Sequence, residues 1–385
     1  MRVLILHSRY LSGPVSGENR VVEDELRLLR EAGHDVVAWT PAPAHPKGLD
    51  LIRTGADSVW STAAAEHVRR TVREREIEVV HCHNLFPSLS PSVIRAAADG
   101  GAGVVMTLHN YRLTCIAGTL LRGGKICESC LGRAPIPGVI HRCYRNSALG
   151  SATLAGSIWM HRTLGSFDRV SLFLAISQFV REKHVSAGIE SARIRVKPHF
   201  AWPTAAREDA GDYILYLGRL APEKGLGSLF AAWSSSFGRL VIAGDGPLAV
   251  DLRRTAPQGT EFVGTVEPEA VTELLRRARA VVVPSLCYEG AGRVVVEAFA
   301  AGVPVLASRI GGLPESIEDN VNGLLAIPGD VADWRRVLSQ IADHGESKRL
   351  GLGALEAWKR MYNPDQARAN LEAGYKAALE VRDLG

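Results

Sequence analysis

Short runs of apolar and β-branched residues alternate with longer amphipathic stretches along almost the whole chain. Most runs are apolar throughout, a pattern typical of strands that a parallel sheet buries on both faces. They form two series, from "RVLILHS" to "VSLFLAIS" and from "YILYLGRL" to "VPVLAS", and residues 200–212 between them have the proline and charge of a linker. At 385 residues the chain has room for two domains. The sequence therefore predicts an α/β protein with two doubly wound domains.

The composition is that of a globular protein, with 46% hydrophobic and 22% charged residues. No apolar run reaches the roughly 18 residues of a spanning helix. The start "MRVLILHSRY" is better explained as a first strand than as a signal peptide. These features favour the cytoplasm, with or without peripheral contact at the inner membrane surface.

Charge is unevenly distributed along the chain. Residues 1–200 hold 25 Lys and Arg against 17 Asp and Glu, whereas the whole chain has 45 against 41, so the second half is acidic. A basic first half suits an anionic membrane or an anionic acceptor, although an ordinary solvated surface would give the same counts. Nucleic acid is a poorer partner, because stacking aromatic residues are not interleaved with the basic ones.

Candidate ligand-binding residues follow the strands of the second series. Doubly wound sheets bind ligands beyond the carboxyl ends of their strands. In "YLGRLAPEKG", Gly218 and Arg219 follow a strand and Lys224 opens a helix. A planar guanidinium and an ammonium in one turn suit a diphosphate, and the glycines let it approach the backbone. A surface turn with two solvated cations is the alternative.

Two glutamates, Glu289 and Glu297, flank the start of a predicted helix in "CYEGAGRVVVEAFAAG". The "GAG" between them leads into the helix N-terminus, where free N–H groups favour an anion. Ionised glutamate only accepts hydrogen bonds, so it suits sugar hydroxyls rather than phosphate. The pattern therefore indicates a phosphate at the helix start with hydroxyls on either side. Alternatively, Glu289 caps the helix and Glu297 pairs with a nearby arginine.

These residues and their surroundings resemble the retaining glycosyltransferases of family 4, which carry an E-x7-E pattern. "LGRLAPEKG", "IAGDGPL", "FVGTV", "AVVVPS", "EAFAAGVPVLAS", "GGLPE" and "NVNGLL" occur in the family's order within residues 213–326, and "GHDV", "TLHN" and "LAIS" match more loosely in the first half. The resemblance implies the GT-B fold, with two Rossmann-like doubly wound domains facing a central cleft. It implies an acceptor-side domain over 1–200, a donor-binding domain over 201–364, and a helix over 365–385 that returns to the first domain.

The resemblance also implies roles for single residues. Arg219 and Lys224 would hold the donor diphosphate and stabilise the leaving charge, and Glu289 would bind hydroxyls of the transferred sugar. Glu297 would bind the ribose. His109 would face the sugar from the first domain, unless it is only a hydrogen-bonded histidine at a strand end. The further donor contacts that the resemblance implies are Gly17, Gly218, Gly290, Ala291, Gly292 and Arg293.

Some of these positions have a second explanation. Gly17 lies in "SGPVSGEN", which is not a dinucleotide fingerprint, and it could serve the turn alone. Ala291 stands where the family often has a larger apolar residue, and Arg293 where the family is often apolar, so both bear on which sugar is used. The family's proposed mechanism has no evident covalent nucleophile and relies on positioning and charge stabilisation. No catalytic metal is expected.

Four of the six cysteines cluster as C-x11-C-x2-C-x12-C in an insertion over residues 112–145. A C-x2-C pair with two outer cysteines suits a tetrahedral zinc site of four thiolates. Disulfides, which the cytosol disfavours, and unligated thiols are the alternatives; His141 is an alternative ligand. Cys82 and Cys287 are expected to be small buried residues. The candidate ligands are Cys115, Cys127, Cys130 and Cys143.

The sequence as a whole predicts a retaining glycosyltransferase that uses a UDP- or GDP-type sugar donor and a glycan or lipid-linked acceptor. A GT-B-like sugar-nucleotide epimerase and a non-catalytic nucleotide-sugar-binding protein are the alternatives. The apolar stretch 147–167 is expected to be a helix that packs in the core or touches a membrane.

Overall fold

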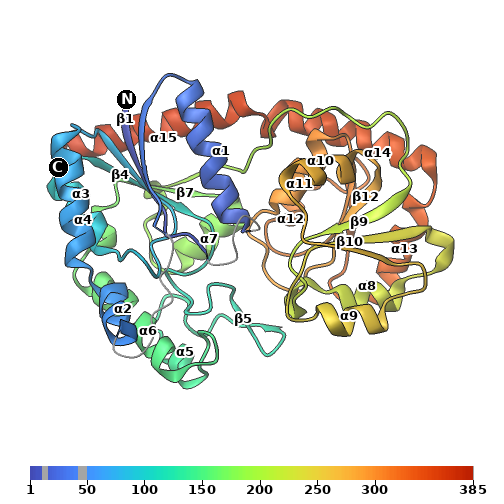
Figure 1. Ribbon diagram of the computed structural model, residues 1–385, viewed down its shortest axis with the longest axis horizontal. Helices are drawn as coiled ribbons and strands as arrows, with labels where there is room; N and C mark the ends of the chain where they lie inside the picture. Colours follow the sequence, from blue (N-terminus) through green and yellow to red (C-terminus); the bar gives the residue numbers. More distant parts are fainter. Residues whose placement is uncertain (11–15, 42–49, 385) are drawn as a thin grey trace. The chain divides into compact units, whose positions relative to one another are not determined.

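The computed structural model describes residues 1–10, 16–41 and 50–384. The chain divides into two compact units (Figure 1). The N-terminal unit comprises Met1–Leu120, Cys127–Lys197 and Arg368–Gly385, and the C-terminal unit comprises Leu121–Ile126 and Pro198–Ala367. Each unit contains its own six-stranded sheet, so each has a core of its own.

The sheet of the N-terminal unit is built from short apolar strands. Its strands lie in the order β2-β1-β3-β4-β7-β8, and all neighbouring pairs are parallel. The inner strands are buried along nearly their whole length, as their uninterrupted apolar sequence predicts. The strands are β1 (Arg2–Leu6), β2 (Asp35–Trp39), β3 (Val79–Cys82), β4 (Gly103–Leu108), β7 (Leu172–Ala175) and β8 (Ile194–Val196).

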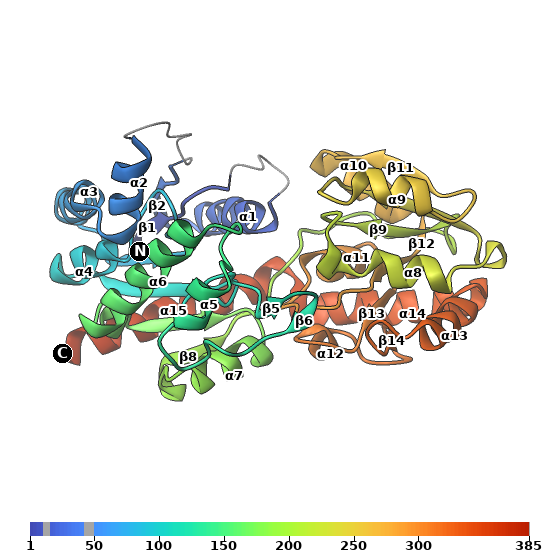
Figure 2. The same ribbon diagram turned by 90° about the horizontal axis from the view of Figure 1, so that it is seen from below.

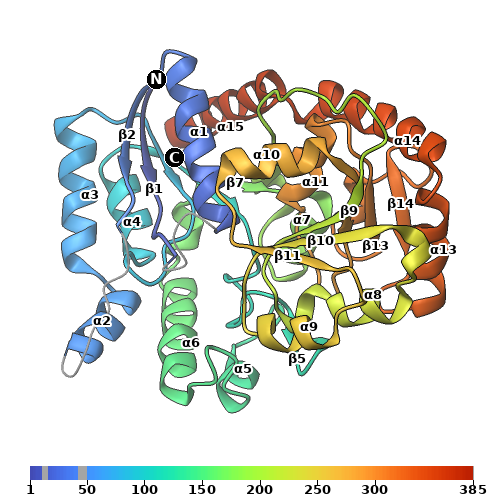
Figure 3. The ribbon, with the colours of Figure 1, turned by 45° about the vertical axis from the view of Figure 1, so that its right-hand side comes forward.

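Helices cover both faces of this sheet. α1 and α15 lie on one face, where Glu25 of α1 and Tyr375 of α15 both reach a side chain of β3. α3 and α4 pack against each other on the opposite face (Figures 1 and 3). The helices of this part of the chain are α1 (Gly17–Glu31), α2 (Asp50–Val59), α3 (Thr62–Glu74), α4 (Ser92–Asp99), α6 (Ala148–Thr163), α7 (Gln178–Ser186) and α15 (Pro364–Leu384).

The sheet of the C-terminal unit is also parallel throughout, in the order β11-β10-β9-β12-β13-β14. The chain runs outward from β9 to β11 on one side and from β12 to β14 on the other. The order therefore reverses between β9 and β12, where doubly wound sheets bind their ligands. The strands are β9 (Tyr213–Leu217), β10 (Arg239–Ala243), β11 (Glu261–Gly264), β12 (Ala278–Val283), β13 (Val305–Ser308) and β14 (Gly323–Ala326).

Two apolar clusters sandwich this second sheet. α10, α11 and the π-helical turn Trp358–Tyr362 pack on one face, and α8, α9 and α13 pack on the other (Figure 1). The predicted pair of doubly wound sheets is thus confirmed. The helices are α8 (Leu226–Ala232), α9 (Ala249–Thr255), α10 (Pro268–Arg276), α11 (Arg293–Ala300), α12 (Leu313–Ser316), α13 (Val331–Ile341) and α14 (His344–Ala357).

Side-chain caps fix where several helices begin. Ser61, Ser147 and Ser177 each accept a hydrogen bond from a backbone N–H of the helix that follows. Asp330 does the same for α13. α11, the helix that follows Glu289, begins after Gly292 and has no side-chain cap. The N–H groups at its start are therefore available to donate hydrogen bonds to another acceptor, such as a ligand.

The residues between β4 and α6 form an insertion with little regular structure. It contains the two-residue strands β5 (Leu121–Arg122) and β6 (Lys125–Ile126) and the short helix α5 (Ile136–Ile140). α5 packs against α6 (Figure 2). The apolar stretch forms α6 and buries one side in the core. No helix among the described residues is long and apolar enough to cross a bilayer.

Candidate functional site

The C-terminal unit brings Lys224 and Glu289 together where its strand order reverses. Lys224 follows β9 and Glu289 follows β12, which are neighbouring strands. Lys224 Nζ lies 2.6 Å from Glu289 Oε1, and the Ser285 hydroxyl donates to the same oxygen. The two charged side chains are only 28% and 16% exposed. Because ligands of doubly wound sheets bind at this position, the pair marks the candidate site of this unit.

The two charges hold each other in the ionised form. Burial alone would raise the pKa of Glu289, but Lys224 and the Ser285 hydroxyl outweigh it and hold that pKa below its usual value. Burial alone would lower the pKa of Lys224, but the Glu289 charge outweighs it and raises that pKa. The stabilisation from this pair is therefore present at neutral pH and is lost only as the pH falls through the lowered pKa of Glu289.

Two glycines allow the loops around this pair to pack closely against each other. Gly225 has φ = 73°, and a Cβ there would lie 1.9 Å from Pro284 O, just beyond β12. Gly311 has φ = 63°, and a Cβ there would lie 2.3 Å from Glu289 O. The same oxygen accepts the N–H of Gly312 at 2.8 Å. A side chain at either glycine would be both strained and overlapping, so the loops after β9, β12 and β13 can pack this closely only with glycine there.

Gly218 and Arg219 form the turn directly after β9. The Gly218 N–H donates to Ala243 O at 3.0 Å, which joins this turn to the end of β10. The Tyr216 hydroxyl donates to Arg219 O at 2.7 Å. Arg219 is exposed, and no ion pair joins it to another residue of the described chain. Unlike Lys224, it is therefore available to an anion without breaking an existing contact.

Glu297 lies in the second turn of α11 and pairs with Arg293. Arg293 Nε lies 2.7 Å from Glu297 Oε1, an i,i+4 helix pair. This is the arginine partner that the sequence left open as an alternative. Gly290, Ala291 and Gly292 precede the helix and are partly exposed. The start of α11 therefore combines uncapped N–H groups with one basic and one acidic side chain, near the Lys224–Glu289 pair in sequence.

In the N-terminal unit, His109 directly follows β4 at the carboxyl end of the sheet. Its Nε2 lies 2.8 Å from Nδ1 of His83, which follows β3, and the two rings stack. The next residue, Asn110, donates its side-chain N–H to Glu18 Oε1 at 2.7 Å. Glu18 comes directly after Gly17 in the first turn of α1. The chain neighbours of His109 and Gly17 are thus joined by one hydrogen bond, and most of the loop before Gly17 lies outside the described residues.

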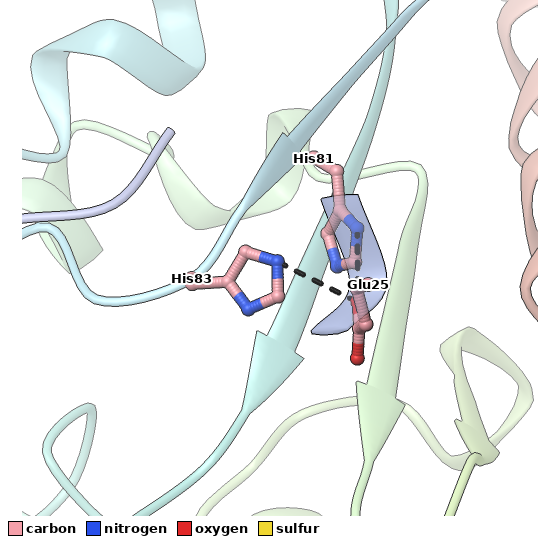
Figure 4. Close-up of side chains that lie close together, drawn as sticks. All are labelled: Glu25, His81 and His83. Atoms are coloured by element: carbon pink, nitrogen blue, oxygen red, sulfur yellow. Dashed lines mark ion pairs between the residues drawn. The ribbon is translucent and has the colours of Figure 1, made fainter. Parts of the chain in front are cut away.

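A buried charged group lies next to His83. Glu25 of α1 is close to both His81 and His83 (Figure 4). One ligand atom from each of these three residues lies within 4.8 Å of the others, as a metal site would need. However, the Lys197 ammonium is bonded to Glu25, and both of these residues are almost completely buried. Lys197 therefore supplies the positive charge that a metal ion would otherwise bring.

The histidines of this group are neutral and engaged elsewhere. Nδ1 of His81 lies 2.9 Å from the Tyr375 hydroxyl and Nε2 lies 2.8 Å from the Thr107 hydroxyl. Burial, with the charge of Lys197, holds the pKa of His81 well below its usual value. Burial and the neighbouring histidines do the same for His83. The Glu25 cluster, which comprises Glu25, His81, His83 and Lys197, is therefore a buried polar network around one ion pair.

Sequence patterns give little sign of the Glu25 cluster. Glu25 lies in a helix rich in charged residues, which are expected to be exposed, and Lys197 is one of two cations in "RVKPHF", with nothing to set it apart from Arg195. The one usable signal is "HCHN", because residues two apart in an extended strand share a face, which places His81 beside His83. Nothing in the sequence marks Ser285 as a site residue except that it follows a predicted strand.

All six cysteines lie in the described part of the chain, and no disulfide joins any two of them there. Cys82 and Cys287 are buried, as predicted. His141, the alternative zinc ligand, is exposed at the end of α5. Within the insertion two cysteines are buried and two are partly buried; these are Cys115 and Cys130, then Cys127 and Cys143.

Two family models match consecutive parts of the chain. The model described as "Glycosyltransferase Family 4" matches residues 15–201. The model described as "Glycosyl transferases group 1" matches residues 211–344. Together they span both units.

Curated relatives and solved structures agree with these matches. Glycogen synthase of Mycobacterium tuberculosis is 28% identical over 335 residues, 81% of this chain and 68% of the relative. The GDP-mannose-dependent alpha-mannosyltransferase of Corynebacterium glutamicum is 28% identical over 366 residues, 89% of this chain and 80% of the relative. Anabaena HepE, solved in complex with UDP, superposes with a TM-score of 0.65 at 17% identity, covering 97% of this chain and 99% of its own. The chain belongs to the family 4 glycosyltransferases and has the GT-B fold.

Proposed function

We propose that the chain is a retaining glycosyltransferase that moves a sugar from a nucleoside-diphosphate sugar to a glycan or lipid-linked acceptor. The observation that carries the proposal is the Lys224–Glu289 pair, held at the point of strand reversal in the C-terminal unit. An ammonium and a carboxylate in contact offer complementary partners to a diphosphate and to sugar hydroxyls. The C-terminal unit would thus be the donor-binding domain, and the N-terminal unit, with α15, the acceptor side.

Within this proposal the diphosphate takes its contacts from the first turn after β9 and from the start of α11. Arg219 and Lys224 supply positive charge, and the uncapped N–H groups around Gly292 donate hydrogen bonds to the phosphate oxygens. Arg293 adds a third cation at the helix start. These donors stabilise the charge that develops on the leaving diphosphate, which is the largest effect a site of this kind can offer.

The acids of the site bind hydroxyls in this proposal. Lys224 and Ser285 both bond to Oε1 of Glu289, so Oε2 is the oxygen that would accept from the transferred sugar. Glu297 accepts from the ribose while keeping its bond to Arg293 on Oε1. His109, in the N-terminal unit, is proposed to face the transferred sugar. Its Nε2 is already hydrogen-bonded to His83 Nδ1. The proposal assigns no divalent metal to the transfer step, and zinc binding by the cysteines is a separate matter.

The relatives support a nucleotide-sugar donor and differ in its base. The Corynebacterium relative is named for GDP-mannose and the Anabaena structure contains UDP. A thermal-shift panel of nucleoside diphosphates and their sugars tests the donor site directly. A UDP- or GDP-type ligand is expected to raise Tm; a panel without any stabilising nucleotide would refute the donor site.

Glu297→Gln is expected to weaken nucleotide binding about tenfold with the fold intact, because a charged hydrogen bond contributes roughly 1.5–3 kcal/mol and glutamine keeps part of it. Binding is measured by calorimetry with the nucleotide that the panel identifies. Glu261→Gln is the matched control, since Glu261 makes a similar pair with Arg239 at 2.7 Å on the surface of the same unit. Equal affinity in both variants would remove Glu297 from the site.

An epimerase or a non-catalytic binding protein would bind the same donor but would not transfer sugar. The products formed from the donor distinguish these three functions. A transferase releases free nucleoside diphosphate in proportion to the glycosylated acceptor, an epimerase changes the sugar while it stays on the nucleotide, and a binding protein does neither. The family membership favours the transferase.

We also propose that the acceptor side contacts an anionic membrane through α6. Leu149 and Trp159 lie on the outer side of this helix and are 72% and 59% exposed. Arg142 and Arg145, just before the helix, are exposed and basic, so the surface combines apolar and cationic groups as interfacial helices do. The double variant Leu149→Ser/Trp159→Ser is expected to lose co-sedimentation with vesicles rich in phosphatidylglycerol. Leu352→Ser, at a residue 71% exposed in the C-terminal unit, should retain it; no binding by the unmodified chain would end the proposal.

A further inference from the structure

Three neighbouring strands of the N-terminal sheet are each followed directly by a histidine. His7 follows β1, His83 follows β3 and His109 follows β4. Because the carboxyl ends of parallel strands meet at one edge of a sheet, the three rings gather there. The ring of His83 is the central one: it stacks on His109 with ring centroids 5.1 Å apart and meets His7 edge-on at 6.2 Å. His83 thus adjoins the residue that is proposed to face the sugar.

The surroundings of His83 hold its ring in place. His83 is 1% exposed, whereas His109 is partly exposed. A further ring, that of His81, has its centroid 4.2 Å from that of His83. His81 is itself hydrogen-bonded to Tyr375 and Thr107. This packing restricts the ring of His83 to one orientation, so its two nitrogens keep fixed neighbours.

The two nitrogens of His83 have different neighbours. Nε2 lies 3.7 Å from Glu25 Oε2 (Figure 4), and Nδ1 lies 2.8 Å from His109 Nε2. Burial holds the pKa of His83 well below its usual value, so the ring is neutral and carries a single N–H. A carboxylate attracts an N–H even beyond hydrogen-bond distance. The proton of His83 is therefore favoured at Nε2, which leaves the lone pair at Nδ1.

The hydrogen bond between the two rings then fixes the tautomer of His109. A hydrogen bond between neutral imidazoles needs one donor and one acceptor. With the lone pair of His83 at Nδ1, the shared proton belongs to His109 Nε2. The opposite tautomer of His109 would place two lone pairs against each other at 2.8 Å. In the favoured tautomer His109 carries its lone pair at Nδ1, so toward a sugar hydroxyl it acts as an acceptor.

We propose that His83 is a positioning residue for sugar transfer, which holds the ring of His109 in place as the Nε2–H tautomer. The inference rests on the proposed function, since it is there that His109 faces the sugar. Glu25, paired with Lys197, acts one step further back by keeping the proton of His83 at Nε2. A buried acid that sets the tautomer of a histidine is the arrangement on which Ser-His-Asp triads depend.

The tautomer of His109 can be measured directly by NMR. In the chain labelled with ¹⁵N-histidine, long-range ¹H–¹⁵N correlations show which ring nitrogen carries the proton, and His109→Gln identifies the His109 signals by their absence. At mildly alkaline pH, the unmodified chain is expected to show His109 as a single Nε2–H tautomer. In His83→Leu, which offers no lone pair, the two tautomers should interconvert and give averaged signals. An Nδ1–H pattern in the unmodified chain, or the same pattern in both proteins, would overturn the proposal.

His161→Leu is the matched control for the loss of a buried histidine. His161 is 0% exposed in the same unit and makes two hydrogen bonds, to Ser166 at 2.8 Å and to the Val59 carbonyl at 2.7 Å. This variant is expected to lower Tm and to leave the His109 signals unchanged. Averaged His109 signals in His161→Leu would show that the tautomer follows overall stability, which would also overturn the proposal.

The rate of transfer tests whether the lone pair of His83 is what matters. His83→Leu is expected to lower kcat about tenfold, the effect of losing one hydrogen bond that holds a reacting geometry. His83→Asn should regain most of that loss, because its amide oxygen takes the place of Nδ1 on Cγ and accepts the same N–H. An equal loss in the two variants would contradict the positioning role. Where His83→Leu is insoluble, the spectrum of the unmodified chain and the rate of His83→Asn decide.

The two kinds of measurement separate this inference from the proposed function. The spectra need neither donor nor acceptor, so a wrong tautomer would overturn the inference alone. His109→Gln that transfers sugar at the original rate would instead remove His109 from the proposed site, and with it any positioning role for His83.

Discussion

Replacement of Lys224 by alanine is expected to lower kcat for sugar transfer by about 10²- to 10³-fold, the usual effect of removing one charge-stabilising donor from an active site. The ammonium is proposed to act on charge that grows as the diphosphate leaves, so its loss reduces kcat more than donor affinity. The rate is measured as release of nucleoside diphosphate from the donor that the thermal-shift panel identifies.

The variant has a structural side effect that a control must separate. Lys224→Ala leaves the mostly buried Glu289 carboxylate without its ion-pair partner, and an unpaired buried charge lowers stability as well as activity. Arg219→Ala is expected to have no such effect, because Arg219 is exposed and its removal breaks no ion pair with another described residue. A similar fall in kcat with unchanged Tm is expected for Arg219→Ala. If both variants transfer sugar at the original rate, the diphosphate is not bound at this turn.

The sequence predicted that Lys224 and Glu289 of the proposed donor site lie in one region, but not that they contact each other. The rule that ligands bind beyond strand ends placed Lys224 and Glu289 in one region, and the structure brings them into direct contact. That contact was not predicted, because the sequence assigned one residue to phosphate and the other to hydroxyls. It depends on how closely the two loops approach, and this is decided by Gly225 and Gly311 through backbone contacts far apart in sequence.

The Glu25 cluster could not be predicted from the sequence, for a different reason. Its members come from α1, from β3 and the residue just after it, and from the end of β8, so every contact of Glu25 in the cluster is long-range. Periodicity describes one element at a time and shows Glu25 only as one of several charged residues in an amphipathic helix. Burial of a charge becomes evident only when its partner is known, and nothing in the sequence joins Glu25 to Lys197.

Replacement of Lys197 by methionine is expected to lower the free energy of unfolding of the N-terminal unit by about 3–5 kcal/mol, because it leaves the Glu25 carboxylate buried without its partner. Glu25 is 0% exposed and Lys197 is 1% exposed, so water cannot replace the lost ammonium. Amide hydrogen exchange of peptides from β1 and β3 in increasing urea measures this unit separately from the other.

Arg27→Met is the matched control, because Arg27 lies in the same helix and pairs with Glu31 at 2.8 Å with both side chains exposed. Removing that pair is expected to cost no more than about 1 kcal/mol. The double variant Lys197→Met/Glu25→Gln should regain part of the loss, since it removes both charges and leaves only polar groups to be satisfied. If Lys197→Met is no more destabilising than Arg27→Met, water or another cation reaches Glu25 in the folded chain. Glu25, His81 and His83 would then again be candidate metal ligands.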